Sequence, residues 1–178
     1  GGNLLSQKNS KKLNLAVSGI LDLMPESMIF CAPHANSYHR FEENSYAPIN
    51  ATWGKDNRTT ALRIPSGNED STRIEHRLSG ADANPYLVMA MLISGFLHGF
   101  EEDPEIPPET VGNGYEDGSR PLPQSWEAAL DLFQNKSRLS SILGQEFSTL
   151  YTQLKSGEQK RFRRVITPHE YDWYLHTV

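Results

Sequence analysis

The sequence predicts an α+β fold in which a few antiparallel strands pack against helices and a helical tail follows. Three observations favour it. Apolar residues recur at helical spacing between residues 9 and 30, three short β-like segments lie between residues 50 and 78, and amphipathic helical patterns fill the chain after residue 125. The chain has 178 residues, 37% of them hydrophobic, which is enough for one sizeable core. We therefore expect one domain.

The first element should be a helix from Asn9 to Phe30. Its apolar positions are Leu13, Val17, Ile20, Leu21 and Met24. Ser10 is a candidate cap for its start, and Pro25 should kink the helix or begin a second one. The stretch from Ala32 to Asn50 is rich in Asn, Ser, Tyr and Pro, which indicates an ordered loop.

The strands come next. The β-like segments are Asn50–Trp53, Thr59–Ile64 and Arg73–Leu78. The sequence Gly-Asn-Glu-Asp at residues 67–70 is typical of a turn, so the last two segments should form a hairpin. Strands of this length need helices against one face, because a small isolated sheet is marginally stable.

A second long helix should follow the hairpin. Asn84 suits an N-cap, and Pro85 suits the first helical position. The residues up to Phe100 are apolar on nearly every side, so we expect this helix to be buried. Residues 1–100 thus form a strand and helix part that carries the candidate site. Residues 101–124 are acidic and rich in Pro and Gly, which indicates a long surface loop.

Residues 125–178 should form the helical tail. Ser125 is a candidate cap for its first helix, and Thr167 with Pro168 should open its last. The helical patterns span residues 125–134, 139–143, 146–165 and 168–176.

Composition narrows the functional classes. A net charge of −5 argues against general nucleic-acid binding. Cys31 is the single cysteine, so no disulfide can form within the chain, and this suits a reducing, cytoplasmic compartment. The apolar run at residues 87–100 is too short to cross a bilayer, and we expect no membrane partner. The chain starts with Gly1-Gly2 and no methionine, so we expect a fragment of a longer protein.

The charged strand Arg73-Ile74-Glu75-His76-Arg77 is the main candidate site. On a strand, alternate side chains share a face, so Arg73, Glu75 and Arg77 would lie in a row. Two cations beside one carboxylate could hold phosphate, a carboxylate and a divalent metal ion together. The alternative is a solvated charge ladder of little energetic weight. These residues alone leave both interpretations open.

Two further arginines precede that strand. Arg58 follows a turn-like run, and Arg63 lies near the end of a strand. Their positions are an odd number of residues apart, so in one regular strand their side chains would point to opposite faces. Arg58 can therefore join a common site only from a turn. Glu75 supplies an ionised oxygen, the kind of ligand that Mg²⁺ or Mn²⁺ prefers, but further ligands must come from elsewhere. His34, His39, His76 and His98 lack metal-ligand spacing, and no phosphate-binding P-loop motif is present.

Five motifs occur in an order that resembles the glutamine synthetase superfamily. They are Asn36-Ser37-Tyr38-His39-Arg40, Trp53-Gly54 through Asn57-Arg58, Leu62-Arg63-Ile64-Pro65, Arg73-Ile74-Glu75-His76-Arg77 and Asp82-Ala83-Asn84-Pro85-Tyr86-Leu87. They lie within residues 30 to 100, and the helices from Pro121 onward resemble the family's tail less specifically.

The resemblance implies an activity and roles for particular residues. In this family ATP phosphorylates the γ-carboxylate of glutamate, and an amine then displaces the phosphate, with Mg²⁺ or Mn²⁺ as the metal. Glu75 would be a catalytic metal ligand. Arg58, Arg63 and Arg73 would contact the ATP phosphates or the transferred phosphoryl group, with Arg58 catalytic. Arg40 and Arg77 would hold glutamate, with Arg58 nearby.

One departure bears on the amine. Glutamine synthetases commonly carry a glutamate in the flap that helps to form the ammonium pocket, and Tyr46 stands at that place here. The sequence from Trp53 to Arg63 also resembles that of the γ-glutamyl-polyamine (glutamate–putrescine) ligase branch of the superfamily. The resemblance thus implies putrescine or another polyamine as the amine. Glutamine synthetase proper, acting on ammonia, and a non-catalytic scaffold with this fold are the alternatives.

The resemblance covers only the C-terminal part of the family's catalytic domain. The family's other metal-binding carboxylates, its histidine motif and its N-terminal β-grasp domain precede the matched region. In the family, that small domain completes the site of a neighbouring subunit in a homo-oligomeric ring. We therefore expect residues 1–178 to be inactive alone.

Overall fold

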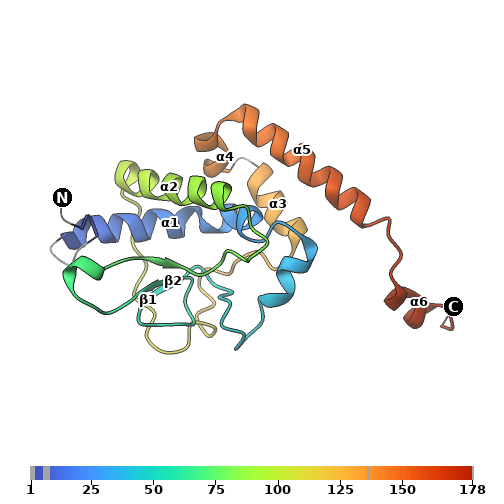
Figure 1. Cartoon of the computed structure of the whole chain (residues 1–178), viewed down its shortest axis with the longest axis horizontal. Coiled ribbons are helices and arrows are strands. Elements are labelled where there is room, and N and C mark those ends of the chain that lie inside the picture. Colours follow the sequence, from blue (N-terminus) through green and yellow to red (C-terminus); the bar gives the residue numbers. More distant parts are fainter. Residues whose placement is uncertain (1–2, 6–8, 136, 178) are drawn as a thin grey trace.

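The computed structural model describes residues 3–5, 9–135 and 137–177. Two long helices lie side by side over a small sheet, and a helical tail extends away from them (Figure 1). This arrangement confirms the expected α+β class. Gly1-Gly2, on which the expectation of a fragment rested, lies outside the described residues.

Helix α1 (Ser10–Cys31) runs without interruption through Pro25, so no second helix begins there. Its N-cap is Asn9, whose side chain makes no capping hydrogen bond, so the expected cap at Ser10 is wrong. Cys31, at the other end, is fully buried. Among the described residues, α1 is the one helix that is, by length and composition, long and apolar enough to span a membrane, a feature not expected from the sequence. However, 67% of that window is buried inside the structure, as in a core helix.

Helix α2 (Pro85–Glu102) crosses α1 at very short range. A Cβ atom added to Gly19 of α1 would lie 2.2 Å from the carbonyl oxygen of Gly95, and one added to Gly99 would lie 1.9 Å from the carbonyl oxygen of Leu15. The backbones therefore touch where both helices lack side chains. Interior packing leaves no slack for an added methyl group at such a crossing.

The start of α2 follows the sequence prediction, but its burial does not. The Asn84 side chain accepts hydrogen bonds from the backbone of Tyr86 (3.0 Å) and Leu87 (3.4 Å), and Pro85 begins the helix. One face is exposed, so the prediction of a buried helix is wrong for that face. The large exposed side chains are Tyr86, Met89, Ile93, Leu97 and Phe100. The described residues place no element over them.

The sheet has three short strands in the order β1-β2-β3: β1 (Trp53–Lys55), β2 (Leu62–Ile64) and β3 (Glu75–His76). Strands β2 and β3 pair antiparallel, as the hairpin prediction required, and the helical turn η3 (Glu69–Ser71) joins them. Strand β1 pairs parallel with β2, which corrects the expectation of antiparallel strands throughout. The chain between them turns back on itself, so both strands start at the same end of the sheet.

The remaining segments frame this core. The expected ordered loop contains the 3-10 helix η2 (Ala35–Arg40). Residues 103–125 form the expected long loop, and they are tied to the sheet by hydrogen bonds such as that from Trp53 Nε1 to the Pro107 carbonyl (2.8 Å). The tail helices are α3 (Trp126–Gln134), α4 (Arg138–Leu143), α5 (Gln145–Phe162) and α6 (Pro168–Tyr174).

The tail is anchored at one end and free at the other. Phe30 of α1 lies 5.1 Å from Phe133 and 4.8 Å from Tyr151, measured between ring centroids, so α3 and α5 pack on the core. Ser125 and Thr167 cap α3 and α6, as predicted. Helix α6 has no buried residues and stands at the far end of α5 (Figure 1).

Candidate active site

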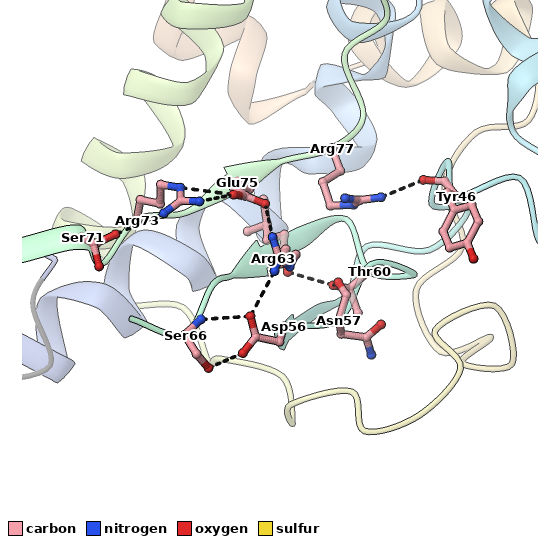
Figure 2. Close-up of polar contacts among 11 residues, drawn as sticks. Tyr46, Asp56, Asn57, Thr60, Arg63, Ser66, Ser71, Arg73, Glu75 and Arg77 are labelled. Carbon is pink, nitrogen blue, oxygen red and sulfur yellow. Dashed lines mark hydrogen bonds and ion pairs between the residues drawn. The ribbon is translucent and has the colours of Figure 1, made fainter. Parts of the chain in front are cut away.

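Glu75 lies at the centre of an ion-pair cluster on the sheet (Figure 2). Arg63 of β2 is its register partner across the hairpin and donates to Glu75 Oε2 at 2.8 Å. Arg73 donates to Oε1 at 2.7 Å. The structure thus brings together three of the predicted site residues, with both carboxylate oxygens engaged.

Arg77 does not flank Glu75, contrary to the predicted row. Strand β3 ends at His76, and the alternation of faces does not extend to Arg77. Its guanidinium instead donates to the Tyr46 carbonyl oxygen at 3.0 Å, pointing away from the cluster (Figure 2). The second cation beside Glu75 is therefore Arg63, which comes from the neighbouring strand.

Asp56 completes the cluster, although no sequence motif marked it as a site residue. Its carboxylate accepts hydrogen bonds from Arg63 Nη2 (3.0 Å), from the Ser66 backbone (3.0 Å) and from the Ser66 hydroxyl. Its φ of +48° places it in the left-handed region, which Asp tolerates better than most residues. Arg63 is thus held between two carboxylates. An Asp beside the Asn-Arg pair of a turn was the only sequence signal.

The cluster keeps its carboxylates ionised. Partial burial raises the pKa of Glu75, but hydrogen bonds and charge from Arg63 and Arg73 outweigh it, and the pKa lies below its usual value. Hydrogen bonds from Ser66, together with the Arg63 charge, lower the pKa of Asp56. An ionised Glu75 is therefore available as an oxygen ligand at neutral pH.

Arg58 lies in the turn after β1, which is the one position from which it could join a common site. Its side chain is exposed and lines a cavity of about 450 Å³, together with Asn57 and residues 109–112 of the long loop. In the described part of the chain, no hydrogen bond or ion pair links it to Glu75. Arg58 therefore borders the cluster without belonging to it.

Arg40 and Tyr46 lie on the Arg77 side of the site. Arg40 Nη2 donates to the carbonyl oxygens of Arg77 (3.4 Å) and Leu78. Partial burial lowers the pKa of Arg40, opposed by the charge of Asp82. Tyr46 is 66% exposed and has a φ of +61°, an uncommon conformation for an aromatic residue. The predicted glutamate-binding arginines thus meet through the backbone around Arg77.

His76 is held neutral beneath the cluster. Burial, reinforced by the charge of Arg40, lowers its pKa from 6.5 to about 4. Because the folded state disfavours the charged ring, the contribution of His76 to the unfolding free energy should be fully present above about pH 6.5. This contribution should be lost as the pH decreases towards 4. His76→Gln should flatten this slope in urea titrations at several pH values. An unchanged slope in that variant would assign the effect to other groups.

The described residues do not complete a metal site. No group of three His, Cys, Asp or Glu side chains comes together among them. Both oxygens of Glu75 are paired with arginine, so an ion could bind it only by displacing one of them. Glu75 can supply one ligand, and the others would have to come from elsewhere.

Comparison with known proteins identifies the family to which this chain is similar. The family model described as glutamine synthetase, catalytic domain, matches residues 1–174. The chain is 43% identical over 178 residues to Gamma-glutamylputrescine synthetase PuuA of Escherichia coli (strain K12), covering 98% of this chain and 38% of that protein. It is 37% identical over 159 residues to Gamma-glutamylethanolamide synthetase GlnA4 of Streptomyces coelicolor, covering 89% of this chain and 33% of that protein.

Solved structures agree on the fold. A structure described as "Apo GmaS without ligand" matches with a TM-score of 0.80 and 24% identity, covering 93% of this chain and 38% of that one. The chain thus spans less than two fifths of the length of these relatives. The family match over residues 1–174 and the fold agree: this chain belongs to the glutamine synthetase catalytic-domain family.

Proposed function

We propose that this chain is the C-terminal part of the catalytic domain of an ATP-dependent carboxylate–amine ligase acting on glutamate. The observation that carries the proposal is the convergence of Arg63 and Arg73 on Glu75, in a chain of this family. Phosphoryl transfer needs positioning and charge neutralisation, and fixed guanidinium groups supply both.

The residues take distinct roles in two steps. Arg58, Arg63 and Arg73 bind the phosphates of ATP while the γ-carboxylate of glutamate attacks the terminal phosphorus, which releases ADP and leaves γ-glutamyl phosphate. Arg40 and Arg77 hold glutamate, with Arg58 nearby. The amine nitrogen then attacks the acyl carbon, loses a proton and expels phosphate, so a γ-glutamyl amide forms.

Glu75 would hold a divalent ion together with carboxylates from outside this chain. Mg²⁺ or Mn²⁺, when bound, supplies charge neutralisation at the transferred phosphoryl group. If Glu75 gave one of its oxygens to that ion, the guanidinium of Arg63 or Arg73 would become free to donate to phosphate instead.

The amine is proposed to be putrescine or a related polyamine. The 43% identity to a γ-glutamylputrescine synthetase supports this. A glutamate–isopropylamine ligase of Pseudomonas, 33% identical over 165 residues, is another relative named for an alkyl amine. Tyr46 supports it as well, because an exposed aromatic ring in the flap suits an alkyl chain better than a carboxylate would.

Purified full-length protein, incubated with ATP, Mg²⁺, glutamate and one amine at a time, tests the proposal. We expect γ-glutamyl amide and ADP with putrescine, at a kcat/KM at least about tenfold above that for ammonium, a difference worth roughly 1.4 kcal/mol. A preference for ammonium would support glutamine synthetase proper, whose name several relatives carry. No product with any amine would support the scaffold alternative. Residues 1–178 alone should form none.

The whole protein is proposed to act as a homo-oligomeric ring with sites shared between subunits. A β-grasp domain upstream would complete the site of its neighbour. Analytical ultracentrifugation of the full-length protein would test this, and a fully active monomer would contradict it.

A further inference from the structure

The turn that carries Arg58 is fastened to a distant part of the chain. We call residues 55–60 the arginine turn and residues 107–114 the covering loop. The two segments are about fifty positions apart in the sequence, yet they form the walls of the same cavity of about 450 Å³ (Figure 1 shows the long loop beside β1).

Asn57 makes most of this connection. Its side-chain amide donates to the carbonyl oxygens of Thr110 (3.1 Å) and Gly112 (2.8 Å) in the covering loop. Its side-chain oxygen accepts from the Thr59 backbone (3.0 Å) and the Thr59 hydroxyl (2.6 Å). Both donors and both acceptor sites of the carboxamide are therefore used. The Asn57 side chain thus ties the backbone on either side of Arg58 to the covering loop.

Neighbouring contacts hold the two segments at one separation. The Gly114 backbone donates to the Thr59 hydroxyl at 2.8 Å, and the Thr110 backbone donates to the Trp53 carbonyl oxygen at 2.9 Å. At Gly54 a Cβ atom would lie 2.9 Å from the Thr110 carbonyl oxygen. The loop therefore packs directly against the backbone of β1, and the arginine turn cannot shift without breaking several hydrogen bonds.

Arg58 has no such support of its own. Its side chain is exposed, and the described residues offer it no hydrogen bond or ion pair. Where its guanidinium lies depends on its backbone, which Asn57 fixes from the preceding position. A displacement of about 1 Å at a group that positions substrate can cost on the order of 10²-fold in rate.

We propose that Asn57 is a positioning residue for Arg58, and that the covering loop, through Asn57, sets where that guanidinium meets substrate. This inference rests on the proposed function, because it takes Arg58 to be a substrate-binding arginine. It assigns the loop between α2 and α3 a part in the site, although the sequence predicted only a surface loop.

The test uses full-length protein and five variants, two of which carry Arg58→Ala. Asn57→Ala removes all four hydrogen bonds. Asn57→Asp keeps the acceptors for Thr59 and removes both donors to the covering loop. Each should lower kcat/KM for amide formation by about 10²-fold. Gln134→Ala is the matched control, since that exposed carboxamide lies on α3, away from the covering loop, and hydrogen-bonds only Asp131 of its own helix; it should change kcat/KM less than twofold.

A double-substitution cycle separates positioning from general structural damage. In an Arg58→Ala background, Asn57→Ala should lower kcat/KM by less than about threefold more, because residues that act through one another are not additive. A full additional loss in that background would overturn the inference, as would normal kinetics in Asn57→Asp. Either result leaves the proposed function intact. Absence of ligation by the unmodified protein would overturn the proposed function and this inference with it.

Discussion

Replacing Glu75 by glutamine in the full-length protein should lower kcat for γ-glutamyl amide formation by about 10³-fold or more. The substitution keeps the shape of the side chain and removes its charge. Arg63 and Arg73 would lose their ionic partner, and a divalent ion would lose a carboxylate ligand. Initial rates at saturating ATP and glutamate, with thermal melting of each variant, provide the measurement.

The Glu75 experiment also decides between the two interpretations of the charged strand. Glu116→Gln is the control, because Glu116 is an exposed carboxylate that accepts only from Asn113 within its own loop. It should keep full activity. If Glu75→Gln retained more than about a tenth of the wild-type rate, the cluster would be a solvated charge ladder, worth little by itself.

The pattern of a single strand predicts only part of the ion-pair cluster around Glu75. Alternation of faces correctly placed Arg73 and Glu75 together, but it also predicted Arg77 beside them. Strand β3 is too short for that, since it ends at His76. The cation that pairs with Glu75 is Arg63, which depends on the register between β2 and β3. Register is a relation between two segments, and the period of neither strand contains it.

Local features of the fold were predictable for the opposite reason. The caps at Asn84, Ser125 and Thr167 each depend on hydrogen bonds within three residues, so their sequence signals suffice. Asp56 and Asn57 were missed as site residues because the partners that give them a place in the site, Arg63 and Gly112, lie 7 and 55 positions away. No periodic pattern marks such contacts.

Helix α2 is an intermediate case. Apolar residues all round a helix predict burial, and the side that meets α1 is indeed buried. Its other side carries Tyr86, Ile93 and Leu97, which are between 51% and 84% exposed. Composition predicts that a surface needs covering, but it does not identify the covering element.

Replacing Gly99 by alanine should lower the unfolding free energy by about 3 kcal/mol, since overpacking a close interior contact costs roughly that much. The added Cβ would lie 1.9 Å from the Leu15 carbonyl oxygen and 3.2 Å from Gly19 Cα. Both neighbours are backbone, so no side chain can rotate away, and α1 and α2 must separate. Urea unfolding followed by circular dichroism measures the change.

Gly157→Ala is the matched control, because Gly157 also lies within a helix but its nearest neighbour is the mobile end of Arg161 at 3.8 Å. This substitution should raise the unfolding free energy by up to about 1 kcal/mol, the difference in helix propensity. Equal stability of the two variants would show that α1 and α2 do not cross this closely.

The separation of α1 and α2 caused by Gly99→Ala should reach the site as well. The Cys31 carbonyl at the end of α1 accepts from the Gly80 backbone, next to the segment that holds Arg40 and Arg77. Gly99→Ala should therefore also raise KM for glutamate.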